Sequence, residues 1–278
     1  MELVIIKIFV SVLTVLLLAA LAEYASPRVA GIIGGSAIGG TAIVLFFFGY
    51  EHGIQYVRDA IPGTIAGLGG EVLFYVGYYR GSQLLEKKRS RIAHIASGTL
   101  VGLLLFFLHA IIIGYIQLTL ISGSIVFLLA TVFGTLYLKR ISPATVPVKA
   151  PFTLKTILLR ACFAGTVILL ITITPYYVPS QWAGVFSAFP TGILPFLVIV
   201  HYTYGDAIFP VFLRNISWSL TTLAVYVLSI YYLYPLCGLA IGTLLGEIIS
   251  FVYLGCVLFL KSSFCSRPSH DGASELHA

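Results

Sequence analysis

Long apolar stretches alternate with short polar or charged segments along the whole chain. A helix needs about 20 consecutive apolar residues to cross the hydrocarbon core of a bilayer. Measured against that length, the pattern predicts nine transmembrane helices, at residues 4–22, 30–50, 60–79, 92–116, 118–138, 152–175, 182–204, 208–231 and 233–260. A closed barrel would show short alternating strands, and an open sheet would leave backbone groups unpaired in lipid. We therefore expect an all-α integral membrane protein.

Two features of this pattern leave alternatives open. Residues 92–138 contain no Lys, Arg, Asp or Glu, and these 47 residues are too many for one crossing, so a turn falls at 114–117 or at 122–124. The first span also resembles a secretory signal peptide, with Lys7, an apolar run and small residues at 19–22. We expect this helix to be retained, because the repeat described below gives it a counterpart.

Composition and charge narrow the class of protein. The chain is 59% hydrophobic and 9% charged, whereas a soluble domain is about 45–50% apolar and about 25% charged. So few charges could not cover a soluble enzyme or a nucleic-acid-binding protein of this length. The basic surplus is a topology signal instead, because 14 of the 16 Lys and Arg residues fall on one side of a nine-span arrangement. We expect a multi-pass protein of the cell membrane, with its N-terminus outside, its C-terminus inside and a disordered cytoplasmic tail at 262–278.

The two halves of the chain also match each other in sequence. Five pairs of segments occur in the same order, namely 30–31 with 183–184, 39 with 192, 50–53 with 203–205 (with one slipped residue), 58–59 with 214–215 and 97–102 with 237–242. Each match is weak alone, because apolar helices resemble one another in composition. Their shared order predicts an internal duplication.

The duplication predicts a 4+1+4 architecture. Residues 1–116 form the first four-helix repeat, 117–151 a linking transmembrane helix with a basic cytoplasmic loop, and 152–261 the second repeat. Five helices, an odd number, separate corresponding positions, so the second repeat must have the opposite orientation in the membrane. Inverted-topology repeats of this kind recur in secondary transporters.

Each half resembles the small four-helix inner-membrane proteins of the GlpM-like group, as if two had been fused through the fifth helix. The small-residue segments 30–40 and 183–192 and the general helix pattern carry this resemblance. It covers nearly the whole chain outside the fifth helix and the tail. The resemblance implies the duplicated fold and supplies no activity.

Glycines and prolines interrupt the second and seventh helices at matching places, which is the best sequence indication of a transport site. The candidate substrate-binding residues are Ser36, Gly39 and Thr41 in the second helix, and Ser187, Pro190, Thr191 and Gly192 in the seventh. Proline removes a backbone hydrogen bond and glycine lets a ligand approach, so the freed backbone groups could hold a polar solute. Close helix packing by small residues is the alternative explanation.

Titratable side chains inside the apolar stretches are candidates for proton or ion coupling. Glu71 lies within the third helix, His109 deep in the fourth and Glu247 midway along the ninth. Burial favours the neutral form of a carboxyl group, and imidazole titrates near neutral pH, so these groups suit proton exchange. Each could instead be a neutral, hydrogen-bonded residue that fixes helix packing, which is the simpler reading for His109.

Polar residues near the helix ends are candidates for the entrances. Arg58 and Arg214 occupy corresponding places at the starts of the third and eighth helices, on opposite faces of the predicted bundle. They could draw an anion toward the midplane, although such arginines often reach lipid headgroups instead. A polar cluster marks the end of the seventh helix, with a second at the matching end of the second helix. They line a vestibule or simply give the helices polar ends. The residues are His201, Tyr202, Tyr204 and Asp206 in the first cluster, and Glu51 and His52 in the second.

These features favour a secondary transporter that moves a small polar or anionic solute by alternating access, coupled to protons or another ion. A non-coupled channel and a membrane scaffold or assembly factor without transport are the alternatives. An enzyme is not expected, because the chain has no H-E-x-x-H, no G-x-S-x-G and no acidic diphosphate-binding cluster. The four cysteines are scattered, so no metal or cofactor is expected. The expected partners are the solute or ion and the lipid bilayer, with no nucleic acid, and the sequence allows a homo-oligomer.

Overall fold

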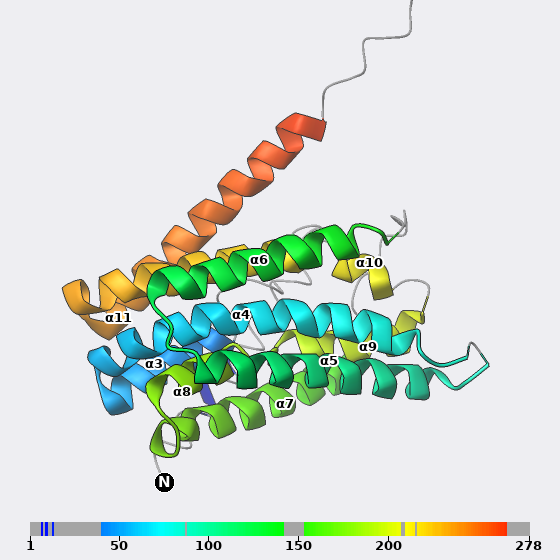
Figure 1. Cartoon of the computed structure of the whole chain (residues 1–278), viewed down its shortest axis with the longest axis horizontal. Helices are drawn as coiled ribbons and strands as arrows, with labels where there is room; N and C mark the ends of the chain where they lie inside the picture. The colour runs from blue at the N-terminus through cyan, green and yellow to red at the C-terminus, as the bar shows by residue number, and fades with distance from the viewer. Residues whose placement is uncertain are drawn as a thin grey trace, which may run out of the picture.

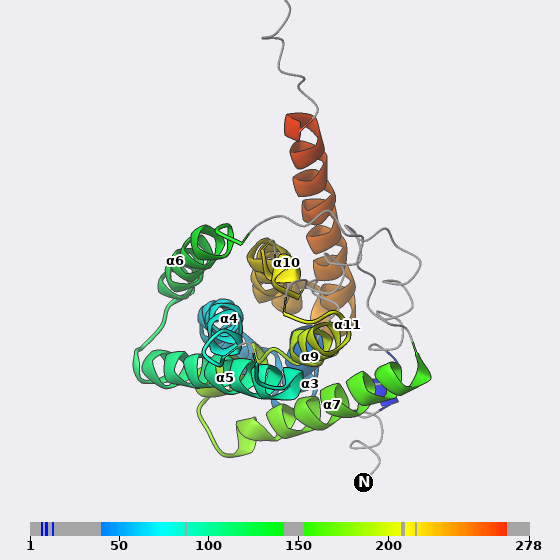
Figure 2. The same cartoon turned by 90° about the vertical axis from the view of Figure 1, so that its right-hand side faces the viewer.

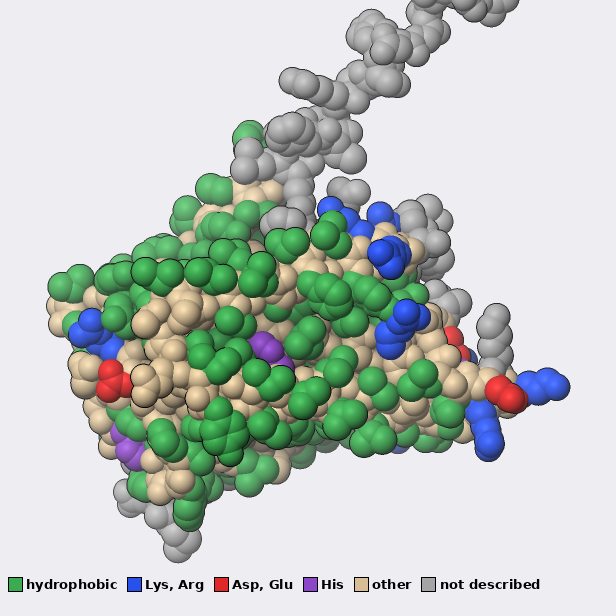
Figure 3. Space-filling model, viewed as in Figure 1, with side chains coloured by type: hydrophobic (Ala, Val, Ile, Leu, Met, Phe, Trp, Pro, Cys, Tyr) green, Lys and Arg blue, Asp and Glu red, His purple; other side chains and the backbone are tan. Residues whose placement is uncertain are grey.

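A computed structural model describes residues 7, 9, 10, 13, 40–86, 88–141, 153–206, 209–214 and 216–265. All regular secondary structure in this part of the chain is helical, which confirms the all-α prediction. Five of the helices are long and apolar enough to cross a membrane, and they indicate a membrane protein. Figure 3 shows hydrophobic side chains over the middle of one face, with charged side chains toward its two ends.

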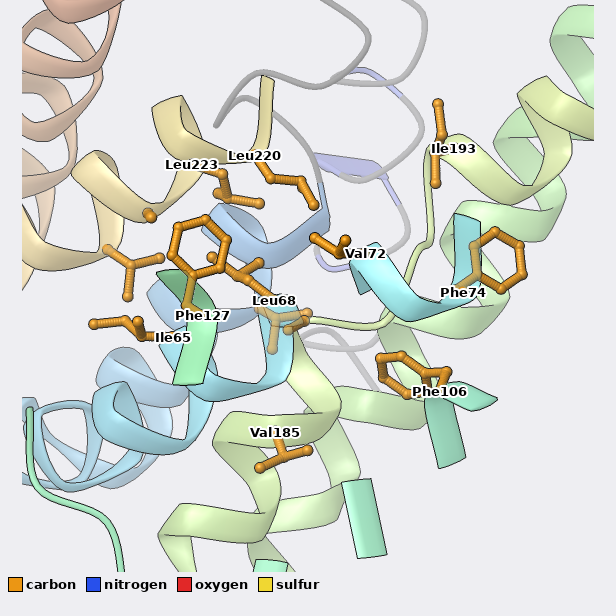
Figure 4. Packing of buried hydrophobic residues seen from close by; sticks show 14 of the residues in the cluster. Ile65, Leu68, Val72, Phe74, Phe106, Phe127, Val185, Ile193, Leu220 and Leu223 are labelled. Carbon is orange, nitrogen blue, oxygen red and sulfur yellow. The ribbon is translucent and has the colours of Figure 1, made fainter. Parts of the chain in front are cut away.

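Helix α4 forms the centre of the bundle and is buried along nearly its whole length. It spans Ile54–Ser82, and its neighbours are α3 (Gly40–His52), α5 (Arg91–Tyr115), α6 (Leu120–Leu138), α8 (Ser180–Ser187) and α11 (Ile216–Cys265) (Figures 1 and 2). Side chains from several of these helices meet in one apolar core, for example Leu68, Phe106 and Val185 (Figure 4). Because this core surrounds α4, the polar side chains of α4 must find hydrogen-bond partners inside the protein.

Glycines on α4 allow its neighbours to approach closely. A Cβ atom on Gly77 would lie 2.9 Å from the Cα atom of Gly102 on α5, and one on Gly67 would lie 2.8 Å from the carbonyl oxygen of Val185 on α8. Real Cβ atoms do not approach backbone atoms this closely. Small residues at helix contacts let backbones meet in a membrane, where van der Waals packing drives helix association.

The contacts along α4 fix the direction of each neighbour. Helix α3 turns into α4 through Gly53, whose φ of 88° suits glycine, so α3 and α4 are antiparallel. Helix α5 is also antiparallel to α4. Helix α8 and its continuation α9 (Ile193–Tyr204) run parallel to α4, because Gly63 meets Gln181 and Tyr78 meets His201.

Helix α11 consists of two arms that meet at Gly238 (φ 77°, ψ 176°), three residues after Pro235. The boundary between the eighth and ninth spans was expected at Tyr232, so the prediction was six residues early. The first arm is antiparallel to α4, since Arg58 contacts Tyr231. The second arm folds back along the first and then leaves the bundle, rising to the top of Figure 2.

The other span boundaries follow the apolar pattern with local differences. The turn between the fourth and fifth spans lies at 116–119, so the first of the two alternatives is correct. The seventh predicted span is divided into α8 and α9. The tail was expected from residue 262, but α11 continues to Cys265. The remaining elements are α7 (Leu154–Ile173), the 3-10 turn η1 (Thr174–Tyr176) and α10 (Phe209–Leu213).

Charged residues divide between the two ends of the bundle. We call the end where α4 finishes and α5 begins the basic end, because Arg80, Lys88, Arg89 and Arg91 lie there, at the right of Figure 1. The opposite end, where α3 turns into α4, is the Gly53 end. Most of the first predicted helix, the first part of the second and the last residues of the tail lie outside the described residues.

Candidate functional site

A break in the middle of the bundle divides the seventh predicted span into α8 and α9. Helix α8 ends at Ser187 and α9 begins at Ile193, so 188–192 are not helical. Pro190 lacks an N–H group and cannot continue the hydrogen-bond ladder of α8. The helix break expected around Pro190 and Gly192 is therefore confirmed.

Hydroxyl groups from three helices surround this break. The Thr41 hydroxyl at the start of α3 donates to the carbonyl oxygen of Ser187 at 2.9 Å. The Thr64 Oγ1 atom on α4 lies 3.1 Å from Ser187 Oγ. Thr191 packs directly against Gly40, with no room for a Cβ atom between them. The second and seventh predicted spans thus meet through polar groups deep in the protein.

The candidate substrate-binding residues divide into three groups by position. Thr41, Ser187, Pro190 and Thr191 are buried at the break. Gly192 is exposed there, and a Cβ atom on it would meet no described residue within 4 Å. Ser36 and Gly39 lie outside the described residues. Thr64 was not anticipated, although a hydroxyl seven residues before a buried carboxyl group on one helix was a usable signal.

Glu71 lies on the same stripe of α4 as Thr64. Residues seven apart occupy nearly the same helix face, about 10 Å apart along the axis. The Glu71 side chain is 7% exposed, and its Oε1 atom accepts a hydrogen bond of 2.5 Å from the Tyr75 hydroxyl. Tyr78, seven residues further on, continues the stripe toward the basic end. Tyr75 is the hydrogen-bond partner that the described residues give to this buried carboxyl group.

His109 and Glu247 lie elsewhere in the fold. His109 Nε2 is 2.9 Å from the carbonyl oxygen of Ala66, a contact that ties α5 to α4. This geometry fits the packing alternative. Glu247 lies on the second arm of α11, where its Oε2 atom is buried with no hydrogen-bond partner among the described residues. No contact among the described residues joins either side chain to Glu71.

Arg58 and Arg214 lie at opposite ends of the bundle. The Arg58 guanidinium stacks over the Tyr231 ring, 4.8 Å from its centroid, at the Gly53 end. Arg214 directly follows α10, which packs against the last part of α4 through Phe209 and Tyr78. Both therefore lie beside helix ends, as expected from their places in the sequence.

Each end of the bundle holds a cluster of polar side chains. At the Gly53 end, Glu51 forms an ion pair with Lys7 and accepts from the Tyr176 hydroxyl at 3.4 Å. At the basic end, Asp206 lies between two histidines, 2.5 Å from His201 and 3.3 Å from His94. The vestibule interpretation named His201 and Asp206.

The sequence reading missed two further members of the basic-end cluster. Tyr78 is 3.1 Å from His201 Nδ1, and His94 is brought in by α5. The pair His94 and Asp206 is separated by more than a hundred residues, so no local pattern marks it. Comparisons with family models, with curated proteins and with solved structures give no match for this chain.

Proposed function

We propose that the protein is a secondary transporter that moves a small polar or anionic solute across the cell membrane by alternating access, coupled to protons. The observation that carries the proposal is the break at 188–192, where hydroxyl groups of three helices meet in the interior. Irregular backbone at membrane depth is tolerated only where protein buries it or where it lines a cavity. Broken helices that face each other across two repeats form the solute sites of many secondary transporters.

The direction of the helices supports the inverted repeat. Helix α3 runs opposite to α8 and α9, and α4 runs opposite to the first arm of α11. Helix α5 runs opposite to the second arm, so each described helix of the first half is reversed in the second. Gly53 and Gly205, with φ of 88° and 79°, follow α3 and α9 at equivalent places. The nine-span 4+1+4 count and the fusion of two GlpM-like units remain part of the proposal.

The basic end faces the cytoplasm in this proposal. Positively charged residues near membrane-spanning segments concentrate on the cytoplasmic side. This rule places the N-terminus outside and the C-terminus inside. Arg58 and Arg214 then flank the external and cytoplasmic entrances, where each could attract an anionic solute.

Glu71 is the best supported proton-coupling residue. It is buried, it shares a helix stripe with Thr64, and Thr64 contacts the break through Ser187. Proton exchange at Glu71 could therefore change the packing that surrounds the solute. Glu247 is a second candidate, because one of its oxygens is buried without a hydrogen-bond partner in the described part of the chain.

The test uses purified protein in vesicles that contain a pH indicator, with a panel of small polar and anionic solutes added outside. We expect at least one solute to move protons with saturating kinetics. Glu71→Gln should lower this coupled movement at least tenfold, whereas Glu86→Gln, a change at an exposed carboxylate, should have no effect.

Other outcomes would contradict the carrier. Solute flux that does not saturate and moves no protons would favour the channel. If none of the solutes in the panel crosses the membrane, the scaffold alternative is favoured. Coupled movement that survives both Glu71→Gln and Glu247→Gln would remove the two carboxyl groups from the mechanism.

A further inference from the structure

The two arms of α11 pack closely against each other next to their kink, at the left of Figure 1. A Cβ atom on Gly242 would lie 2.6 Å from the Tyr234 ring, and one on Gly246 would lie 2.9 Å from the Ile230 side chain. Glycine at both places lets the second arm approach the first. Polar side chains in this contact must therefore find their partners between the arms.

Four polar side chains meet there, and we call them the α11 seam. The Tyr234 hydroxyl lies 2.9 Å from Thr243 Oγ1. The Tyr226 side chain faces both of these hydroxyl groups, and both tyrosines interact electrostatically with Glu247. The two tyrosines are fully buried. The seam thus consists of Tyr226 and Tyr234 from the first arm and Thr243 and Glu247 from the second.

Two polar atoms of the seam lack hydrogen bonds. The Tyr226 hydroxyl and the Glu247 Oε2 atom are buried, yet neither makes a hydrogen bond of ordinary length and angle with a described residue. Within the same residues, Glu247 also forms no ion pair with Lys, Arg or His. Buried polar groups are nearly always satisfied by protein, water or an ion. Two unsatisfied oxygens in one contact indicate a ligand that they share.

The directions of the hydrogen bonds show what kind of ligand suits these oxygens. The Thr243 hydroxyl donates to the Leu239 carbonyl oxygen at 2.8 Å, so its oxygen accepts from Tyr234. The Tyr234 proton is then engaged, and the Tyr234 oxygen presents only lone pairs to the rest of the seam. The Tyr226 hydroxyl is the remaining donor of the four side chains, and one neutral donor does not cancel the charge of a carboxylate.

The depth of Glu247 in the membrane makes that charge costly. Glu247 follows Gly238 by nine residues, which is about 14 Å along the helix, and the hydrocarbon core is about 30 Å thick. A charged carboxylate near the middle of a bilayer needs a partner that neutralises it. A cation of one charge does so, whereas a divalent cation would leave a surplus charge. Oxygen atoms are the ligands that hard cations prefer.

We propose that the α11 seam binds a monovalent alkali cation such as Na⁺. The Glu247 carboxylate neutralises the ion, and the hydroxyl oxygens of Tyr226 and Tyr234 contribute lone pairs. For its role in transport the inference rests on the proposed function, to which it adds a second coupling ion beside the proton assigned to Glu71. The cation site lies within the second half of the chain, whereas Glu71 lies in the first half.

The first experiment measures equilibrium binding of ²²Na⁺ to the full-length protein in detergent micelles. The pH is about 8, which favours an ionised carboxyl group beside a cation, and choline keeps the ionic strength constant. We expect saturable binding of one ion per chain. Glu247→Gln and Tyr226→Phe preserve side-chain shape and should each lower the affinity at least about tenfold. Tyr253→Phe is the matched control, because its hydroxyl also joins the two arms, through Thr221 at 3.1 Å, but lies outside the seam.

Two results of this binding experiment overturn the site. Wild-type protein that is folded but binds no ²²Na⁺ at millimolar concentration would show that a proton or water satisfies the seam instead. Equal affinity in wild type, Glu247→Gln and Tyr226→Phe would place the bound ion elsewhere. Circular dichroism and gel filtration establish that each variant is folded. Tyr226→Phe, which loses a single oxygen atom, decides the matter if Glu247→Gln does not fold.

The second experiment compares solute-coupled proton movement in vesicles with Na⁺ or with choline outside. If the seam couples a second ion, Na⁺ should raise the rate at least about tenfold in wild type and have no effect in Tyr226→Phe. Equal wild-type rates in Na⁺ and choline overturn the coupling role. If no solute of the panel moves but ²²Na⁺ binding still depends on Glu247, the carrier fails and the cation site stands.

Discussion

Substitutions of two glycines in the seventh predicted span, Gly184 and Gly192, distinguish a role of this span in helix packing from a role in solute binding. Gly184 lies against the backbone of α4, where a Cβ atom would lie 3.0 Å from the Thr64 nitrogen and closer still to the Ala60 carbonyl. Inserting a methyl group into such a contact costs about 1–3 kcal/mol. Gly184→Ala should therefore lower the free energy of unfolding by that amount.

Gly192 differs from Gly184 in both space and function. Its backbone angles (φ −87°, ψ −40°) are open to any residue, and within the described part of the chain no heavy atom lies within 4 Å of an added Cβ. Gly192→Ala should change the free energy of unfolding by less than about 0.5 kcal/mol. If a solute approaches this backbone, the methyl group should still reduce solute-coupled proton movement at least tenfold.

The assay combines unfolding by titration with a denaturing detergent in mixed micelles and proton movement in vesicles, with both variants measured beside the wild type. Gly184→Ala with wild-type stability would contradict the close contact between α8 and α4. Gly192→Ala with normal proton movement would show that no solute contacts this part of the break, and the break would then serve packing alone.

Two further predictions concern hydrogen bonds near the site. A double-mutant cycle of Thr64→Val and Ser187→Ala should give a coupling energy of about 0.6–1.7 kcal/mol, the range for hydrogen bonds between helices in a membrane, and strict additivity would contradict their contact. His109→Phe should lower the free energy of unfolding by a similar amount through loss of the bond to Ala66, yet leave proton coupling intact; loss of coupling in a stably folded variant would return His109 to the mechanism.

Much of the fold could be predicted from the sequence, because helix length and helix-breaking residues are local signals. Apolar runs located α5 and α6, and Pro190 with Gly192 located the break. The kink at Gly238 was misplaced because the apolar run continues through it, although Pro235 marked the neighbourhood. The turn at 116–119 stayed ambiguous because no charged residue separates the two helices.

The candidate site was harder to predict from the sequence, because its contacts join segments that are far apart along the chain. Ser187 was named from its place beside a proline, but its partner Thr64 depends on how closely α8 packs on α4. His94 was not considered, since only the fold brings it to Asp206. Sequence patterns identify which helices are unusual, whereas the partners of their polar groups depend on three-dimensional packing.

Sided labelling of single cysteines tests the opposite orientation of the two halves most directly. In a variant without the four native cysteines, Gln55→Cys places a thiol just after α3, and Tyr202→Cys places one near the end of α9. Both side chains are exposed. A membrane-impermeant maleimide should label Gln55→Cys in intact cells and Tyr202→Cys only after the membrane is opened. Labelling of both positions from the same side would contradict the inverted arrangement and the carrier built on it.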